Sequence, residues 1–138
     1  MQIQPYLFFD GRCEEALNFY REALGAEVTA LMRFKDNPEP GMNPPGSEEK
    51  IMHASIRIGD SEVMASDGNC AGKPNFSGVA LTLTAPDVAT ADHLFARLSE
   101  QGQVQMPMSE TFFSPRFGMV ADRFGVSWMV IVNPTDKE

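Results

Sequence analysis

The feature that most constrains the fold is an internal repeat in the order of expected helices and strands. The apolar residues of Cys13–Leu24 recur at the spacing of one helix face, which predicts an amphipathic helix. A shift of about 75 residues places Phe19 of this helix on Leu94 of a second helix, which Asp87 begins and Gly102 ends. A strand precedes each helix and three strands follow it. The sequence therefore predicts an α+β fold in which a βαβββ module occurs twice.

We expect a single domain over residues 1–138, made of two modules at about 1–70 and 76–134. A helix followed by three strands gives a curved, mostly antiparallel sheet that is open on one side. Two such sheets set side by side would form a trough, and concave surfaces of this kind bind small molecules. The segment Asp36–Lys50 holds four prolines and two glycines, so it is predicted to be a long loop; a lid over the trough is one role for it.

The closing stretch, Arg116–Val132, reads as a hairpin. Two apolar runs flank Asp122-Arg123-Phe124-Gly125. An Asp at the start of a turn accepts hydrogen bonds from the backbone that follows it, and a Gly takes the positive φ that closes the turn.

Charge and hydropathy exclude several kinds of partner. The net charge of −8 disfavours nucleic acid and anionic membranes, which attract basic surfaces. No apolar run approaches the roughly 20 residues that span a bilayer. The first residues lack the basic flank and apolar centre of a signal peptide, so cytoplasmic residence is expected.

Several segments resemble the PhnB-like branch of the vicinal oxygen chelate superfamily, which includes glyoxalase I, extradiol dioxygenases and bleomycin-resistance proteins. The matching segments cover nearly the whole chain: Pro5–Phe9, Ala16–Tyr20, Leu24–Ala26, His53–Gly59, Val63–Asp67, Phe117–Gly118 and Asp122–Met129. The resemblance implies two βαβββ modules around a trough and favours a homodimer. PhnB-like sequences usually carry Phe-Trp where this chain has Phe112-Phe113, so its ligand preference is expected to differ.

The resemblance also implies where a divalent metal would bind. Metal-dependent members place ligands on four strands, and register carries those positions to Tyr6, Ala65, Gly78 and Met129. Gly and Ala offer no donor atom, and a thioether suits soft Cu(I) rather than Zn, Ni or Mg. We therefore expect no divalent metal at the usual positions.

His53 is the best catalytic candidate. It shares one face of a predicted strand with Ser55 and Arg57, so a titratable base, a hydroxyl and a guanidinium lie together. The alternative is a face turned to solvent, or a histidine satisfied by a neighbour. Asp67 and Glu110 end strands of opposite modules, and with His53 they would make an acid/base pair or a nonstandard metal site.

Aromatic and methionine side chains on the strands suit a flat or apolar ligand. Ordinary core packing accounts for at least half of the residues in this predicted lining: Tyr6, Phe8, Phe112, Phe113, Phe117, Trp128 and Met129. We therefore predict a metal-free, PhnB-like, small-molecule-binding protein. The alternatives are an enzyme that uses His53 with Asp67 or Glu110 on a small oxygenated substrate, and a structural dimer with a filled trough.

Overall fold

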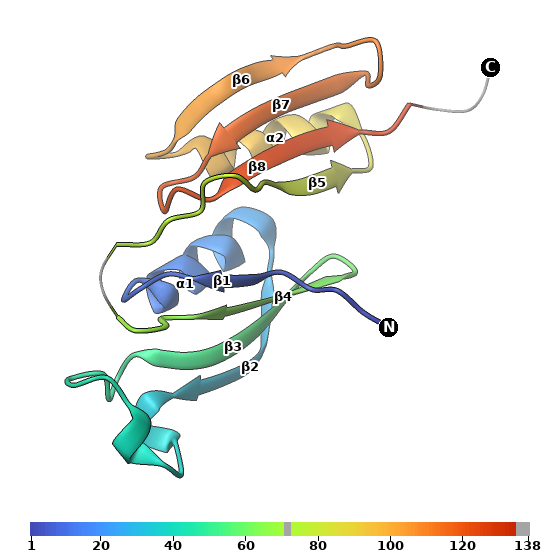
Figure 1. Cartoon of the computed structure of the whole chain (residues 1–138). Helices are drawn as coiled ribbons and strands as arrows, with labels where there is room; N and C mark the ends of the chain where they lie inside the picture. Colours follow the sequence, from blue (N-terminus) through green and yellow to red (C-terminus); the bar gives the residue numbers. More distant parts are fainter. Residues whose placement is uncertain (71–72, 135–138) are drawn as a thin grey trace. The chain divides into compact units, whose positions relative to one another are not determined.

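The computed structural model describes residues 1–70 and 73–134 and divides the chain into two compact units, Met1–Pro74 and Asn75–Glu138. We call them unit 1 and unit 2. Each unit contains one helix and a four-stranded sheet in the order βαβββ (Figure 1). The predicted α+β class and the repeated module are confirmed. Among the described helices, none has the length and apolar character needed to cross a membrane.

Unit 1 builds its sheet in the order β1-β4-β3-β2. Strand β1 runs parallel to β4, and the other neighbours are antiparallel. The elements are β1 (Tyr6–Phe8), α1 (Cys13–Leu24), β2 (Glu27–Arg33), β3 (Ile51–Ile58) and β4 (Ser61–Ser66). The predicted loop before β3 contains two short 3₁₀ turns, Phe34–Asp36 and Pro40–Met42.

Unit 2 repeats this topology in the order β5-β8-β7-β6, again with the first strand parallel to the last. The elements are β5 (Leu81–Ala85), α2 (Val88–Ser99), β6 (Gln103–Ser109), β7 (Arg116–Ala121) and β8 (Ser127–Val132). Strand β5, which precedes α2 as predicted, begins at Leu81. Gly78 has a φ of +84°, which belongs to a turn and not to an extended strand.

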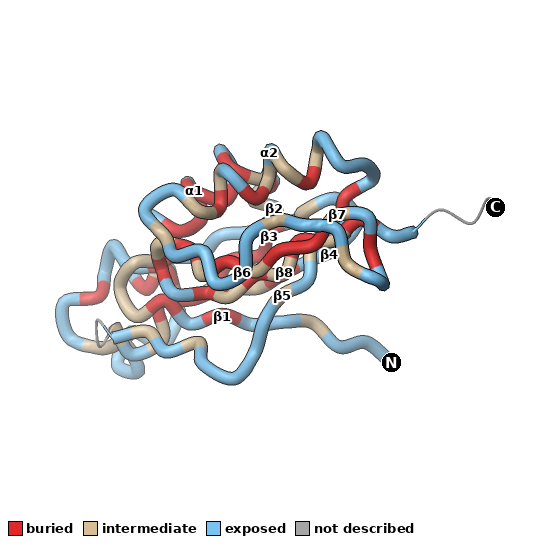
Figure 2. The backbone as a smooth tube through the Cα atoms, turned by 90° about the horizontal axis from the view of Figure 1, so that it is seen from above, coloured by how far each residue is buried: buried red, intermediate tan, exposed pale blue. Residues whose placement is uncertain are grey.

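Each helix covers one face of its own sheet, and each core lies between the two (Figure 2). In unit 1 the residues of the covered face are small or branched and buried: Ala54, Ile56, Val63 and Ala65. They alternate along β3 and β4 with side chains of the opposite face, as the two-residue period of a strand requires. That opposite face carries no helix of its own unit among the described residues.

Asp122 organises the closing hairpin as its sequence predicted. Its Oδ1 accepts hydrogen bonds from the backbone N–H groups of Phe124 at 2.9 Å and Val126 at 3.1 Å. Gly125 takes a φ of +91°, which a side chain would strain. The hairpin therefore depends on a local carboxylate and a glycine.

Candidate functional site

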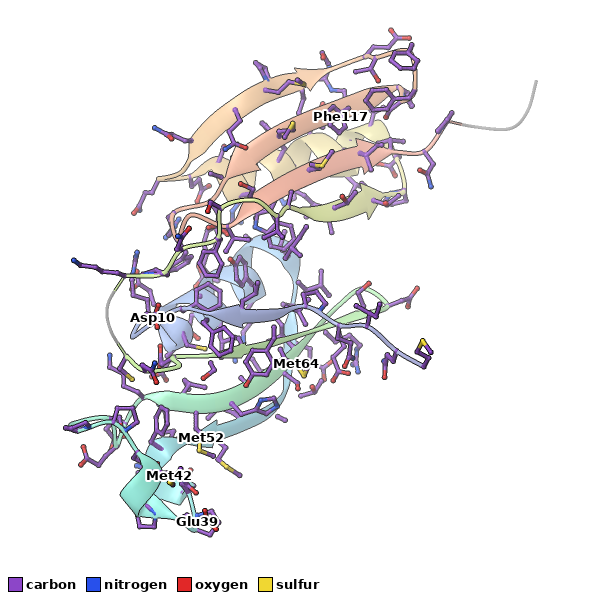
Figure 3. The ribbon with its side chains drawn as sticks, viewed as in Figure 1. Asp10, Glu39, Met42, Met52, Met64 and Phe117 are labelled. Atoms are coloured by element: carbon purple, nitrogen blue, oxygen red, sulfur yellow. The ribbon has the colours of Figure 1, made fainter. Side chains whose placement is uncertain are left out.

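The uncovered sheet face of unit 1 brings together polar and aromatic side chains from three strands. Strand register pairs Tyr6 on β1 with Met64 on β4, and Met64 with Ser55 on β3. Paired residues of neighbouring strands point to the same face. Figure 3 labels Met64 at this place on β4. We call the surface the Tyr6–His53 patch, and define it as Tyr6, Phe8, His53, Ser55, Met64 and Ser66.

A hydrogen bond between Tyr6 and His53 lies at the centre of the patch. The Tyr6 hydroxyl is 2.8 Å from His53 Nδ1, and the two ring centroids are 5.6 Å apart. When Tyr6 donates this bond, the ring proton of His53 sits on Nε2, which is then a donor. Burial raises the pKa of Tyr6, and a hydrogen bond with Ser66 opposes the rise. The hydroxyl therefore stays protonated at neutral pH and can act as a donor.

Phe8 and Met64 give the patch an apolar, partly accessible part. The ring of Phe8 stacks on that of Tyr6, with centroids 4.9 Å apart. Phe8 is 51% exposed and Tyr6 is 36% exposed, although both are large and apolar. Ser55 and Ser66 are buried. The patch thus offers a stacking surface beside one pair of polar groups.

Arg57 lies on the same strand as His53 and is paired with a carboxylate. Its guanidinium forms an ion pair with Glu27 on the neighbouring strand, and both side chains are more than half exposed. The opposite charge of Glu27 reduces the attraction that Arg57 would have for an anion. Its predicted role in ligand binding stays a prediction.

Asp67 follows β4, as predicted, and is buried and hydrogen-bonded within unit 1. It is 1% exposed. Its Oδ1 accepts from the N–H groups of Gly11 at 2.7 Å and Cys13 at 2.8 Å, and its Oδ2 accepts from Ile51 N–H at 2.8 Å. These bonds satisfy the start of α1, whose N-cap residue makes no side-chain cap bond. Asp67 therefore has a structural role at the start of α1 and of β3, and its predicted catalytic role stays a prediction.

Glu110 follows β6 in unit 2 and is exposed. His53 belongs to unit 1. The predicted cooperation of Glu110 with His53 stays a prediction.

The aromatic residues of unit 2 divide between surface and core. Phe112 is 99% exposed, and Phe113 packs edge-on against Phe117 with centroids 5.0 Å apart. Trp128 lies on the covered face, is 3% exposed and donates its indole N–H to Asp122 Oδ2 at 2.9 Å. Trp128 is thus part of the core of unit 2 and of the hairpin, and its predicted contact with a ligand stays a prediction.

The strand registers also change which residues of this chain correspond to the superfamily's metal ligands. Ala65 lies on the covered face of β4, so Met64 is the residue of that strand on the uncovered face. Gly78 precedes β5, where Thr82 is the partner of Met129. In neither unit do three His, Cys, Asp or Glu side chains gather as a metal site needs, over residues 1–70 and 73–134.

Sequence reasoning missed Met64, Ser66 and Thr82 as residues of the uncovered faces. The two-residue period of β4 groups Met64 with Ser66, so the signal for those two was present. The signal for Thr82 was hidden, because the register of a parallel pair depends on a strand 47 residues away.

Comparison with known proteins gives full-length matches. A family model described as 3-demethylubiquinone-9 3-methyltransferase matches residues 1–131. Protein YjdN of Escherichia coli (strain K12) is 36% identical, over 96% of this chain and 95% of that protein.

Two solved structures are similar over nearly their whole length. Protein PA1353 from Pseudomonas aeruginosa is 41% identical with a TM-score of 0.85, over 96% of this chain and 98% of that chain. The putative 3-demethylubiquinone-9 3-methyltransferase, PhnB protein, from Bacillus cereus is 28% identical with a TM-score of 0.79, over 96% of this chain and 99% of that one.

Proposed function

The chain belongs to the 3-demethylubiquinone-9 3-methyltransferase family, as a PhnB-like member of the glyoxalase superfamily, and we propose that it binds a small, uncharged, largely apolar molecule on the Tyr6–His53 patch. The observation that carries this proposal is the 2.8 Å bond between Tyr6 and His53 on a face that also exposes Phe8. An aromatic platform beside a few fixed polar groups is the usual composition of a small-molecule site.

The chemistry of the patch favours an uncharged ligand. A carboxylate or phosphate is normally held by an arginine fork or a lysine. The arginine that shares the strand, Arg57, is paired with Glu27. Tyr6 and His53 supply one or two hydrogen bonds, and the ring of Phe8 supplies contact area.

We further propose that this binding needs no divalent metal. At the positions compared with the superfamily's ligands, unit 1 offers a phenol and a thioether, Tyr6 and Met64, and unit 2 offers a hydroxyl and a thioether, Thr82 and Met129. Such a set is a poor match for Zn, Ni or Mn, which prefer imidazole and carboxylate. Protein purified without a metal-affinity tag should contain far less than one of these ions per chain by mass spectrometry. Stoichiometric Zn, Ni or Mn would contradict this part of the proposal.

The binding site itself is tested with matched variants of the full chain. A library of uncharged aromatic fragments is screened by saturation-transfer NMR against wild type, His53→Ala and Tyr6→Phe. Each variant removes one member of the hydrogen bond, so we expect affinity for the bound fragments to fall by about fivefold or more, the value of one hydrogen bond. The control is His93→Ala, which removes the exposed histidine of α2. Fragments that bind wild type and His53→Ala equally well would refute the site.

An enzyme is the second candidate, and the same hydrogen bond favours it. A phenol that bonds an imidazole is an acid/base pair able to move a proton to or from a small oxygenated substrate. Isomerase or lyase chemistry would show as new product signals in the fragment mixture with wild type, lost in His53→Ala and kept in His93→Ala. Binding without turnover supports the first candidate.

A homodimer is the expected assembly. Strand β1 has only three residues and forms one edge of its sheet, so a second chain has backbone groups available to it there. Light scattering on the purified full chain gives the mass directly, and a monomer at micromolar concentration would contradict the proposal.

A further inference from the structure

A row of three methionines crosses the sheet of unit 2. Register pairs Met106 on β6 with Met119 on β7, and Met119 with Met129 on β8. We call these three residues the thioether row. On β5 the row continues with Thr82, whose hydroxyl lies 3.9 Å from the sulfur of Met129. Three neighbouring strands therefore each carry a methionine at the same level of the sheet.

The row lies on the face that α2 does not cover. Val120 and Val130 follow Met119 and Met129 along their strands and are completely buried, so they point to the helix. Met106 is 42% exposed, and Met119 and Met129 are half-buried. Ordinary packing in the core of unit 2 accordingly does not explain the row.

The spacing of the row allows the three sulfur atoms to meet. Residues directly opposite on neighbouring strands have Cβ atoms about 5 Å apart. A methionine side chain has three rotatable bonds and a terminal thioether, so it reaches across such a gap without strain. In the structure the sulfur of Met129 lies beside the Thr82 hydroxyl, so a cation above β7 would draw it toward Met119 by rotation of its side chain.

We infer that the thioether row binds a soft monovalent cation of the Cu(I) class. Uncharged thioether sulfur is a good ligand for Cu(I) and a poor one for Mg, Mn or Zn. The negative net charge of the chain favours a cation at any accessible surface. Of the three methionines in the thioether row, only Met129 is also one of the positions that correspond to the superfamily's metal ligands. No residue of the Tyr6–His53 patch belongs to the row. The site is therefore independent of the proposed function.

Silver(I) is the probe, because it has the ligand preferences of Cu(I) and does not change its oxidation state in air. Thiols bind both ions more tightly than thioethers do, and the chain has two: Cys13, which is buried, and Cys70, which is partly exposed. The full chain is therefore prepared as Cys70→Ser. Silver nitrate is added in chloride-free buffer to protein labelled with ¹³C at the methionine methyl groups.

Nine methionine methyl signals report on the experiment at once. We expect the signals of Met106, Met119 and Met129 to shift together and to saturate at one ion per chain. Met119→Leu keeps the volume and removes the central sulfur, so it should weaken binding by at least about tenfold, because even the loss of a supporting residue costs a metal site that much. The matched control is Met42→Leu. Met42 lies in the loop before β3 and is 78% exposed, so its substitution should leave the affinity for silver unchanged.

Three outcomes would overturn the inference. In the first, Met42 shifts as strongly as the row, which would mean that silver binds any exposed thioether. In the second, free L-methionine at equal thioether concentration removes the ion from the chain. In the third, Met119→Leu binds silver as tightly as the Cys70→Ser protein that carries all three methionines. Met129→Leu is measured as well, so that a local rearrangement around residue 119 does not decide the result alone.

Discussion

The hydrogen bonds of Asp67 give a sharp test of how unit 1 is held together. One carboxylate joins three segments: the loop before α1 through Gly11, the first turn of α1 through Cys13, and the start of β3 through Ile51. Asp67→Asn keeps the size of the side chain and replaces one acceptor oxygen by an amide N–H₂. If the amide oxygen stays with Gly11 and Cys13, the amide nitrogen faces the N–H of Ile51, and two donors oppose each other.

The expected loss of stability in Asp67→Asn is the sum of three effects on hydrogen bonding and burial. A hydrogen bond to a charged group contributes about 1.5–3 kcal/mol, and the N–H of Ile51 is left buried without its partner. The two remaining bonds become neutral and weaker. A neutral amide is easier to bury than a carboxylate, which offsets part of the loss. We expect a net decrease of about 2–3 kcal/mol in the free energy of unfolding, a large share of the 5–15 kcal/mol that is typical of a domain.

Urea unfolding followed by far-UV circular dichroism measures the change, and amide hydrogen exchange locates it. Exchange should speed up most at Ile51, because its bond is the one lost. The matched control is Asp60→Asn in the exposed turn between β3 and β4, which should change stability by less than about 0.5 kcal/mol. A loss below about 1 kcal/mol for Asp67→Asn, or unchanged exchange at Ile51, would show that the carboxylate does not hold these segments together.

Three further predictions concern single side chains. Burial raises the pKa of Tyr6 above 10.0, so its contribution to stability is complete below pH 10.0 and is lost as pH rises through the raised pKa; Tyr6→Phe should remove this alkaline component of a melting-temperature profile, and an unchanged profile would contradict it. A Cβ on Gly102 would lie 2.3 Å from the carbonyl oxygen of Ala121, so Gly102→Ala should cost about 3 kcal/mol in urea unfolding, whereas Gly41→Ala, with no atom within 4 Å, should cost under about 0.5 kcal/mol. Asp87 accepts a 2.7 Å bond from the first turn of α2, which lowers its pKa, so Asp87→Ala should speed amide exchange in that turn at neutral pH but not below the pKa of Asp87; equal exchange rates at neutral pH would refute the cap.

Local periodicity was sufficient to predict the fold. The helix Cys13–Leu24 and the hairpin Arg116–Val132 agree with the sequence expectation at both ends. The shared face of His53 and Ser55 was also predicted, because polar and apolar residues alternate along β3.

The site could be predicted only in part, because its contacts are not local. Asp67 binds partners 54 and 56 residues away in the sequence, and no short pattern carries that information. The buried position of Trp128 could not be predicted, because the residues from 128 to 132 are all apolar and the strand offers no alternation that separates its two faces. The bond between Tyr6 and His53 likewise depends on the parallel register of β1 with β4.

The position of β4 and β8 within the sheets has a consequence for how each unit folds during synthesis. Each is the last strand of its unit in chain order, yet each lies inside the sheet, between the first strand and the third. The first strand of unit 1 can pair only after β4 has been synthesised, because Tyr6 pairs with Met64. The first strand of unit 2 likewise needs β8, because Leu81 pairs with Trp128. Neither sheet can therefore be completed from its N-terminal part, and until the last strand leaves the ribosome the first strand of each unit is an unpaired edge that invites aggregation.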